Sequence, residues 1–260
     1  MLQPALLEFV NVSVMRGLHP VLHRLNMTIE DGEHVAILGP NGCGKSTLIK
    51  TITRECYPLR DPDSHLRIMG KTTWNIFELR RFLGIVSNDL LNTTTRDLTG
   101  CEVVLSGFFS SMGIWPNHEV TPLMRTKAQE VLHLLEVPHL AERLITEMSS
   151  GEVHRIMIGR ALVHEPRALL LDEPSTSLDL FAQQELRTIL RKLALAGTGI
   201  LLITHHLSDI IPEIDRVILL KQGRVFADGK KAEVLNQEHL GQLFGLPVTL
   251  QQRHGYYHLW

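Results

Sequence analysis

The segment Gly39–Thr47 constrains the fold of this chain more than any other feature. It reads Gly-Pro-Asn-Gly-Cys-Gly-Lys-Ser-Thr and follows the short apolar run His34–Leu38. The residues that come next, Leu48–Thr53, predict a helix. A glycine-rich loop between a buried strand and a helix is typical of proteins in which strands and helices alternate around a parallel sheet.

The rest of the chain continues this alternation. Leu6–Met15 alternates apolar and polar residues and predicts a strand at a solvated face. Further short apolar runs predict strands at Leu25–Ile29, Leu83–Ser87, Ala168–Leu171, Ile200–Thr204 and Val217–Leu220, the last followed by a turn at Gln222-Gly223. Helices are predicted around Met124–Leu135, Gly151–His164 and Leu180–Ala196. We therefore expect an α/β fold with a mostly parallel sheet, and a separate helical lobe over about residues 88–165.

Composition excludes several classes of protein. The 260 residues include 26 Lys and Arg against 28 Asp and Glu, a formal net charge of −2, which argues against a protein that binds nucleic acid through overall basic charge. No apolar run approaches the roughly 18–20 residues of a membrane-spanning helix, and the first residues lack the features of a signal peptide. The three cysteines are far apart and predict neither a disulfide framework nor a zinc site.

The segment Gly39–Thr47 also predicts a functional site. It matches the phosphate-loop pattern G-x-x-x-x-G-K-[S/T] without a mismatch. In such a loop the backbone N–H groups surround phosphate oxygens, Lys45 reaches the terminal phosphates, and the hydroxyl of Ser46 is a ligand for Mg²⁺. The alternative is an ordinary glycine turn into a helix, which the flanking strand and helix disfavour.

Two carboxylates follow a second predicted strand. Asp172 and Glu173 end the apolar run Ala168–Leu171, and successive residues at a strand end point in different directions. Asp172 suits Mg²⁺, and Glu173 suits a general base that polarises the attacking water. An apolar strand that ends in an acidic residue is often only structural, but the phosphate loop makes the functional interpretation the stronger one.

The segment Ser149–Glu152, Ser-Ser-Gly-Glu, precedes a predicted helix. Ser149 and Glu152 have the spacing of a capping box, which predicts only helix initiation. The same exposed N–H groups and hydroxyl can also form an anion site. The two interpretations are compatible.

Together these motifs resemble the ATPase subunit of ATP-binding-cassette proteins. The landmarks run in the order of that family: Gly39–Thr47, Ser149–Glu152, Asp172-Glu173, Ser177–Asp179 and Thr204-His205. The resemblance implies a P-loop NTPase (RecA-like) fold with an N-terminal antiparallel β part. It also implies one nucleotide-binding domain over residues 1–260, with a core lobe at about 1–87 and 166–260 and a helical lobe at about 88–165. Val104–Gly113, Ser149–Glu152 and Thr204–Ile210 resemble a narrower group, the ATPase components of molybdenum-transport or photorepair type.

The resemblance also implies a mechanism in which two cassettes enclose two ATP molecules and Mg²⁺. Ser149, Gly151 and Glu152 of one cassette would face the phosphate loop of the other, and Asp179 would join the two sites. His205 would contact the γ-phosphate and help to hold Glu173 and the water. The residues implied to bind ATP are Gly39, Pro40, Asn41, Gly42, Cys43, Gly44, Lys45, Ser46, Thr47 and Arg16.

The sequence departs from the family pattern at three places. Arg16 stands near the position of an aromatic residue that stacks on adenine, and its guanidinium can stack as well. Asn88 follows the strand Leu83–Ser87 where the family has a glutamine that senses Mg²⁺ and communicates with the membrane partner. The amide is kept, one methylene shorter. Finally, the signature reads Ser-Ser-Gly-Glu where Ser-Gly-Gly-Gln is typical, although Ser149 and Gly151 are present.

For each of two further features, the sequence allows two interpretations. Cys43, inside the phosphate loop, is either a small filling residue or a thiolate stabilised by the surrounding N–H groups. The aromatic segment Gly107–Pro116 is either core or, as the resemblance implies for this part of the helical lobe, a docking surface for a short helix of a membrane subunit.

The sequence thus favours a Mg²⁺-dependent ATPase that drives an ABC transporter, with an importer preferred because the chain holds a single cassette. We expect a homodimer or a pair with a second cassette, transmembrane permease subunits, no direct nucleic-acid binding, and a cytoplasmic location at the inner face of the plasma membrane. The alternative is a soluble cassette ATPase that acts on nucleic acid, the ribosome or another protein, and Asn88 favours it. A small-molecule kinase would leave Ser149–Glu152, Asp179 and His205 without a role.

Overall fold

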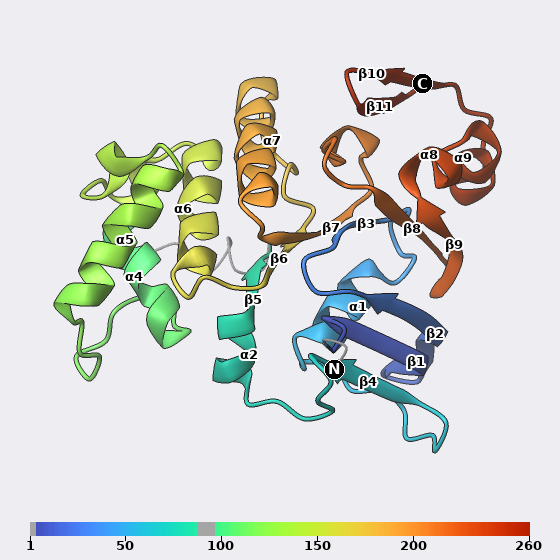
Figure 1. Cartoon of the computed structure of the whole chain (residues 1–260), viewed down its shortest axis with the longest axis horizontal. Coiled ribbons are helices and arrows are strands. Elements are labelled where there is room, and N and C mark those ends of the chain that lie inside the picture. Colours follow the sequence, from blue (N-terminus) through green and yellow to red (C-terminus); the bar gives the residue numbers. More distant parts are fainter. Residues whose placement is uncertain (1–3, 88–96) are drawn as a thin grey trace. The chain divides into compact units, whose positions relative to one another are not determined.

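The computed structural model describes residues 4–87 and 97–260, and Figure 1 shows the path of the chain through them. The chain divides into two compact units. Met1–Ile76 and Ala194–Trp260 form the first, and Phe77–Leu193 forms the second. The boundaries of the core and helical lobes drawn from the sequence remain a prediction.

A three-stranded antiparallel sheet begins the first unit. Its strand order is β2-β1-β4, formed by β1 (Leu7–Arg16), β2 (His19–Ile29) and β4 (His65–Ile68). Leu7, Phe9, Val12 and Val14 are buried, so the alternation of β1 shifts by one residue between Phe9 and Val12. Asn11 lies at this irregularity with a φ of 50°, and its N–H donates to the side-chain oxygen of Asn26 (2.9 Å).

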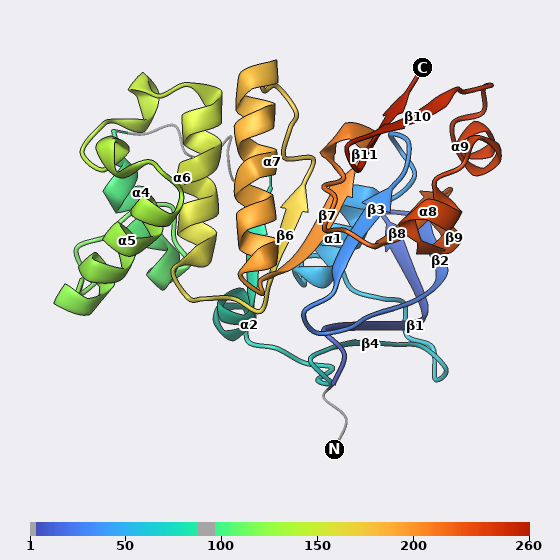
Figure 2. The ribbon, with the colours of Figure 1, turned by 45° about the horizontal axis from the view of Figure 1, so that its top comes forward.

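A second sheet holds the strands β7-β3-β8-β9 of the same unit (Figure 2). They are β7 (Gly199–Thr204), β3 (His34–Leu38), β8 (Arg216–Lys221) and β9 (Arg224–Lys230). β3 pairs in parallel with β7 and β8, and its apolar residues are buried as expected for a strand covered on both faces. Gln222 and Gly223, with φ of 47° and 70°, form the predicted turn between β8 and β9.

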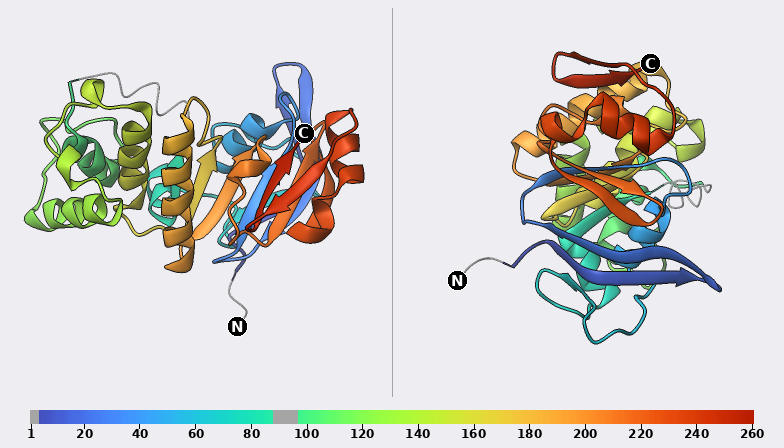
Figure 3. Two further views of the ribbon diagram at one scale, coloured as in Figure 1. Left: turned by 90° about the horizontal axis from the view of Figure 1, so that it is seen from above. Right: turned by 90° about the vertical axis from the view of Figure 1, so that its right-hand side faces the viewer.

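The first unit is completed by short elements around these sheets. They are α1 (Lys45–Ile52), the 3-10 turn η4 (Leu207–Asp209), α8 (Lys231–Val234), α9 (Gln237–Phe244), and a C-terminal hairpin of β10 (Leu250–Arg253) and β11 (Tyr256–Leu259). β2 runs beside β9 (Figure 3), and the N–H of His23 donates to the carbonyl of Gly223 (2.9 Å). This contact brings the N-terminal sheet to the β8–β9 turn.

The second unit is rich in helices. Its elements are α2 (Ile76–Phe82), β5 (Leu83–Val86), α4 (Gly100–Ser106), η1 (Gly107–Phe109), α5 (Pro122–Leu134), η2 (Pro138–Leu140), η3 (Ile145–Glu147), α6 (Ser150–Leu162), β6 (Ala168–Asp172) and α7 (Leu180–Leu195). β5 and β6 pair in parallel, and α4, α5 and α6 pack on one another (Figure 1). A Cβ on Gly107 would lie 2.2 Å from the carbonyl oxygen of Arg160, so glycine permits η1 to approach α6 closely.

The predicted α/β fold class is confirmed, with parallel strand pairing and an antiparallel N-terminal part. Among the helices of the described residues, none is both long and apolar enough to cross a membrane.

Candidate functional site

The phosphate-loop motif lies where the sequence predicts it, between β3 and α1. Gly42 and Gly44 have φ of 79° and 112°, a conformation that side chains other than glycine rarely adopt. A Cβ on Gly39 would come within 2.5 Å of both the Leu220 carbonyl oxygen and Cys43 Sγ. Because the N-cap Gly44 has no side chain, no side-chain oxygen caps the first N–H groups of α1, which suits an anion at this helix start.

Lys45 is buried against the loop that it follows. Its Nζ donates to the carbonyl oxygens of Gly39 (2.7 Å) and Pro40 (3.1 Å), so the cationic end already lies within the loop. Ser46 is exposed, as Asn41 is, whereas Thr47 is buried. A hydroxyl that is open to solvent at this position suits a ligand for an oxygen-coordinated cation.

Cys43 is buried in the loop, beside Gly39, and its carbonyl accepts from the N–H of Gly223 (2.8 Å). This packing is what the filling-residue interpretation predicts. The thiolate interpretation stays a hypothesis.

His205 is brought to the start of the phosphate loop. Thr204, the last residue of β7, stands opposite Leu38 in β3, and the N–H of Gly39 donates to the Thr204 carbonyl (3.3 Å). The rings of His205 and His206 lie face to face at a tilt, with centroids 3.8 Å apart. The first unit therefore places together the phosphate loop and the histidine predicted to act on the terminal phosphate.

Asp172 is the last residue of the buried strand β6 in the second unit and Glu173 follows it, and both are half-buried. Glu173 has a φ of 47°, a strained backbone conformation for a residue with a side chain. Its carbonyl accepts from the N–H of Thr176 (3.1 Å), which closes a tight turn directly after the strand. Strain of this kind is commonly retained where a side chain must point in one direction.

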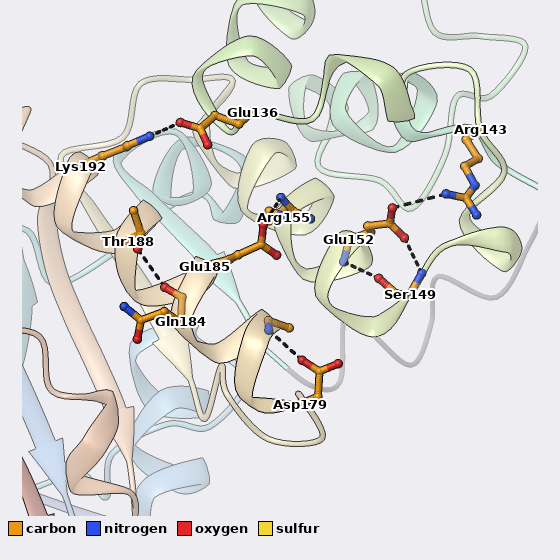
Figure 4. A network of polar contacts seen from close by, with 11 residues as sticks. Glu136, Arg143, Ser149, Glu152, Arg155, Asp179, Gln184, Glu185, Thr188 and Lys192 are labelled. Carbon is orange, nitrogen blue, oxygen red and sulfur yellow. Dashed lines mark hydrogen bonds and ion pairs between the residues drawn. The ribbon is translucent and has the colours of Figure 1, made fainter.

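The start of α6 is a complete capping box, as the spacing predicts (Figure 4). The N–H of Ser149 donates to Glu152 Oε2 (2.7 Å), and the N–H of Glu152 donates to Ser149 Oγ (3.3 Å). Arg143 pairs with the same carboxylate (3.4 Å) and also donates to the Glu147 carbonyl (2.6 Å). The hydrogen bond from the Ser149 backbone is the main reason that the pKa of Glu152 lies below its usual value.

Asp179 caps the neighbouring helix. Its Oδ1 accepts from the N–H of Ala182 (2.8 Å) at the start of α7. Gly151 of α6 lies against Ala182, and Arg155 of α6 pairs with Glu185 of α7 (3.2 Å) (Figure 4). The second unit thus brings Ser149, Gly151, Glu152 and Asp179 close to one pair of helix ends.

Two predicted site residues remain to be described. Arg16 is exposed at the end of β1, where it stands opposite His19 in the β1–β2 hairpin. Asn88 lies outside the described residues, so its predicted role is untested.

Part of the aromatic segment Gly107–Pro116 fits the core interpretation, and part fits the docking-surface interpretation. Phe108 meets His164 edge-on (5.3 Å between centroids), Phe109 stacks on His118 (4.2 Å), and both are half-buried. Trp115, in contrast, is 51% exposed.

Sequence reasoning missed the residue that holds this segment in place. Arg160 of α6 is only 8% exposed and donates to Ser106 Oγ (3.3 Å) and to the Ser111 carbonyl (2.9 Å). Burial lowers the pKa of Arg160 to about 10. An arginine within an amphipathic helix pattern carries no signal that would have distinguished it from a solvent-exposed one.

Oxygen donors dominate the predicted cation site. The Ser46 hydroxyl and the Asp172 carboxylate are hard ligands of the type that Mg²⁺ takes together with substrate phosphates. Within residues 4–87 and 97–260, no group of three or more His, Cys, Asp or Glu residues could hold a metal ion. Ser46 lies in the first unit and Asp172 in the second, and the cation site that they are predicted to form stays a prediction.

Comparison with known proteins identifies related chains. Residues 22–176 match the family model described as ABC transporter. A hemin import ATP-binding protein of Bordetella parapertussis is 33% identical, with 94% of each chain covered. The structure of cbiO1 from Clostridium perfringens, part of the ABC transporter complex cbiONQ, is 27% identical with a TM-score of 0.77, covering 92% of this chain and 94% of that one. A dimeric ATP-binding cassette in a post-hydrolysis state with ADP and Pi is 26% identical with a TM-score of 0.69, covering 86% and 98%.

Proposed function

The chain belongs to the ABC transporter family of ATPases, and we propose that it hydrolyses ATP as a dimer with Mg²⁺ to drive import through separate membrane subunits. The proposal rests on one observation: the N–H of Gly39 donates to the carbonyl of Thr204, so the residue before His205 is hydrogen-bonded to the phosphate loop. That bond holds the backbone directly before His205 beside the loop that would bind the terminal phosphates.

In this proposal the phosphate loop binds ATP. The backbone N–H groups of Gly42–Ser46 surround the β- and γ-phosphates, and Lys45 exchanges its carbonyl partners for phosphate oxygens. Mg²⁺, held by Ser46 and Asp172, would neutralise charge on these phosphates. Arg16 would meet the adenine, and Asn88 would supply an amide oxygen near the cation.

Hydrolysis would proceed by attack of a water oxygen on the γ-phosphorus, while the bond from that phosphorus to the β–γ bridging oxygen breaks. Glu173 would orient the water and accept its proton, and ADP and inorganic phosphate would leave. His205 would hold the γ-phosphate. The turn that fixes Glu173 supports this role, because phosphoryl transfer depends chiefly on positioning.

The dimer would complete the site. The Ser149 hydroxyl accepts from the N–H of Glu152 and donates to its carboxylate within the capping box, so it would exchange this acceptor for a phosphate oxygen. Ser149 and Gly151 of one chain would meet the γ-phosphate held by the other, and Asp179 would link the two sites. Support comes from the related cassette that forms a dimer with ADP and Pi. Hydrolysis would then depend on closure of two chains.

We propose that ATP hydrolysis by this chain drives transport. The related hemin import protein supports an importer, in which this chain would sit at the cytoplasmic face of the plasma membrane against permease subunits. The narrower resemblance to molybdenum-transport and photorepair ATPase components stays a prediction, as do the two lobes. Trp115, an exposed aromatic residue of the segment Gly107–Pro116, is proposed to meet the membrane partner.

ATP hydrolysis is tested with two variants. We expect Glu173→Gln to bind ATP, to lose at least about a hundredfold in kcat, and to sediment as an ATP-dependent dimer. We expect Lys45→Ala to lose nucleotide affinity instead. Unchanged turnover in Glu173→Gln would remove this residue as the base, and normal affinity in Lys45→Ala would contradict the phosphate-loop assignment.

The membrane partner is tested by capture from detergent-solubilised cells with tagged Glu173→Gln and ATP. Recovery of an integral membrane protein that is lost in Trp115→Ala but kept in Leu123→Ala would support transport, since Leu123 is also an exposed apolar residue (78%). Recovery of ribosomal or other soluble partners alone would favour the non-transport alternative.

A further inference from the structure

A buried carboxylate lies four residues after His205. Asp209, in η4, is only 4% exposed, and its Oδ2 accepts a hydrogen bond from Thr204 Oγ1 (2.9 Å). Thr204 is fully buried at the end of β7. Burial of a carboxylate costs free energy unless the carboxylate is hydrogen-bonded. A turn at the protein surface does not need a buried carboxylate.

The hydroxyl of Thr204 has a second partner. It accepts from the backbone N–H of His206 (3.0 Å) while it donates to Asp209. The carbonyl of Thr204 in turn accepts from the N–H of Gly39 (3.3 Å). The residues on both sides of His205 are therefore tied to one buried hydroxyl, and through the Thr204 carbonyl to the phosphate loop.

Neighbouring elements cover the segment from Thr204 to Asp209. Strand β11 of the C-terminal hairpin packs on η4, and a Cβ on Gly255 would lie 3.1 Å from Pro212, just beyond that turn. The N–H of Asp209 donates to the His206 carbonyl (3.2 Å), which closes the turn on itself. The segment from Thr204 to Asp209 therefore has both a buried anchor and a cover.

We propose that Asp209 is a positioning residue for ATP hydrolysis: through the Thr204 hydroxyl it fixes the backbone on both sides of His205, and so aims the imidazole at the γ-phosphate. The inference rests on the proposed function of His205. Asp209 itself does not touch the nucleotide in this assignment. Its loss changes how often His205 is correctly placed, and thus kcat more than KM.

The test measures ATPase kinetics and thermal unfolding in the full chain. Asp209→Leu should lower kcat about tenfold and leave KM for ATP within about twofold. Asp209→Asn should keep most of kcat, because its amide oxygen can still accept from Thr204. As the matched control, Asp228→Leu removes an aspartate that accepts from Arg216 (2.7 Å) in the same unit, and it should lower Tm without lowering kcat.

A double variant separates position from stability. Thr204→Val with Asp209→Leu replaces both members of the buried pair by apolar groups, so that neither is left unpaired by loss of the other. We expect Tm to recover toward that of the unsubstituted protein while kcat stays about tenfold low, since His206 has lost its acceptor. Recovery of kcat together with Tm would overturn the inference and leave a structural role only.

The variant His205→Ala separates the role of His205 from that of Asp209. Loss of activity in His205→Ala with normal kcat in Asp209→Leu would overturn the role of Asp209 and leave the proposed function standing. Normal activity in His205→Ala would overturn the proposed function of His205 and the inference with it.

Discussion

Gly151 and Ala182 touch where α6 and α7 begin: a Cβ built on Gly151 would lie 2.7 Å from the Cβ of Ala182. Asp179 accepts from the N–H of Ala182, so this contact connects Gly151 with the cap of α7. Real Cβ atoms do not approach so closely. Gly151 is therefore required for packing within the second unit, apart from any contact with a nucleotide.

A substitution at Gly151 separates these two requirements. We expect Gly151→Ala to lower the free energy of unfolding by about 1–3 kcal/mol, because the added methyl group overpacks the contact. Adding Ala182→Gly removes the opposing methyl group and should restore stability. If Gly151 also approaches the γ-phosphate, the double variant regains its stability but not its ATPase activity.

The measurements are urea unfolding and ATP turnover for both single variants and the pair. Ala182→Gly alone is the control, since it opens space without filling any. Full recovery of turnover in the double variant would show that Gly151 serves packing only.

The capping box predicts a pH dependence of stability. The pKa of Glu152 is lowered, first by the hydrogen bond from the Ser149 backbone and further by Arg143 and Arg155. A carboxylate with a lowered pKa in the folded state stabilises the fold above its unfolded pKa, and that contribution is lost as pH falls through the folded pKa. The difference in unfolding free energy between the unsubstituted protein and Glu152→Gln should therefore be largest near pH 7 and shrink below about pH 4.5.

Urea unfolding at several pH values between 7 and 4 checks this expectation. Glu119→Gln, at an exposed position outside any helix, is the matched control for loss of one carboxylate. A stability difference that stays constant on acidification would mean that the charge of Glu152 contributes nothing to the cap.

Local features of this fold could be predicted because neighbouring residues determine them. The Ser149–Glu152 spacing predicts a capping box, and Gln222-Gly223 predicts a tight turn, since each depends on hydrogen bonds or backbone angles within four residues. The strand before the phosphate loop, His34–Leu38, is equally local, because four of its five residues form a continuous apolar run.

The remaining features depend on contacts that no pattern in the sequence announces. The Gly151–Ala182 contact joins helices whose relative position is set by the packing of the whole unit. Strands β10 and β11 carry mixed polar residues, so their alternation is too weak to predict a hairpin. The Thr204–Asp209 bond needs the 3-10 turn η4, which hydrophobic periodicity does not reveal.

A substitution of Arg160 tests which hydrogen bonds hold the aromatic segment Gly107–Pro116. Its guanidinium donates to Ser106 Oγ and to the Ser111 carbonyl, and Arg80 donates to the neighbouring Ser110 carbonyl (2.9 Å). We expect Arg160→Met to lower the free energy of unfolding by about 1–3 kcal/mol, because buried acceptors lose their donor. Arg67→Met, which removes an arginine with a 44% exposed side chain in a surface pair, should change stability by less than about 1 kcal/mol.

Urea unfolding and limited proteolysis within Gly107–Pro116 provide the measurement for Arg160→Met. Faster cleavage there accompanies a loss of stability if the guanidinium holds the segment. A more stable variant would instead mean that the cost of burying the cation exceeds the value of its hydrogen bonds.

The charge of Glu152 has a consequence for closure of the proposed dimer. The carboxylate lies directly beside Ser149, where the γ-phosphate of the partner site is proposed to bind, and like charges repel. Arg143 offsets this charge through its contact with Glu152 (3.4 Å). In a Glu173→Gln background, Arg143→Met should therefore raise the ATP concentration needed for dimerisation about three- to tenfold, and Glu152→Gln added to it should reverse that rise.

Sedimentation across a range of ATP concentrations measures this double-mutant cycle, whose coupling we expect to be about 1 kcal/mol and to weaken at high salt. Lys192→Met is the matched control, because Lys192 pairs with Glu136 near the other end of α7 and should not affect ATP-dependent dimerisation. Equal ATP dependence in Arg143→Met and its background would show that solvent alone screens Glu152. A dimer that requires no ATP in any of these variants would instead contradict the proposed enclosure of nucleotide between two chains.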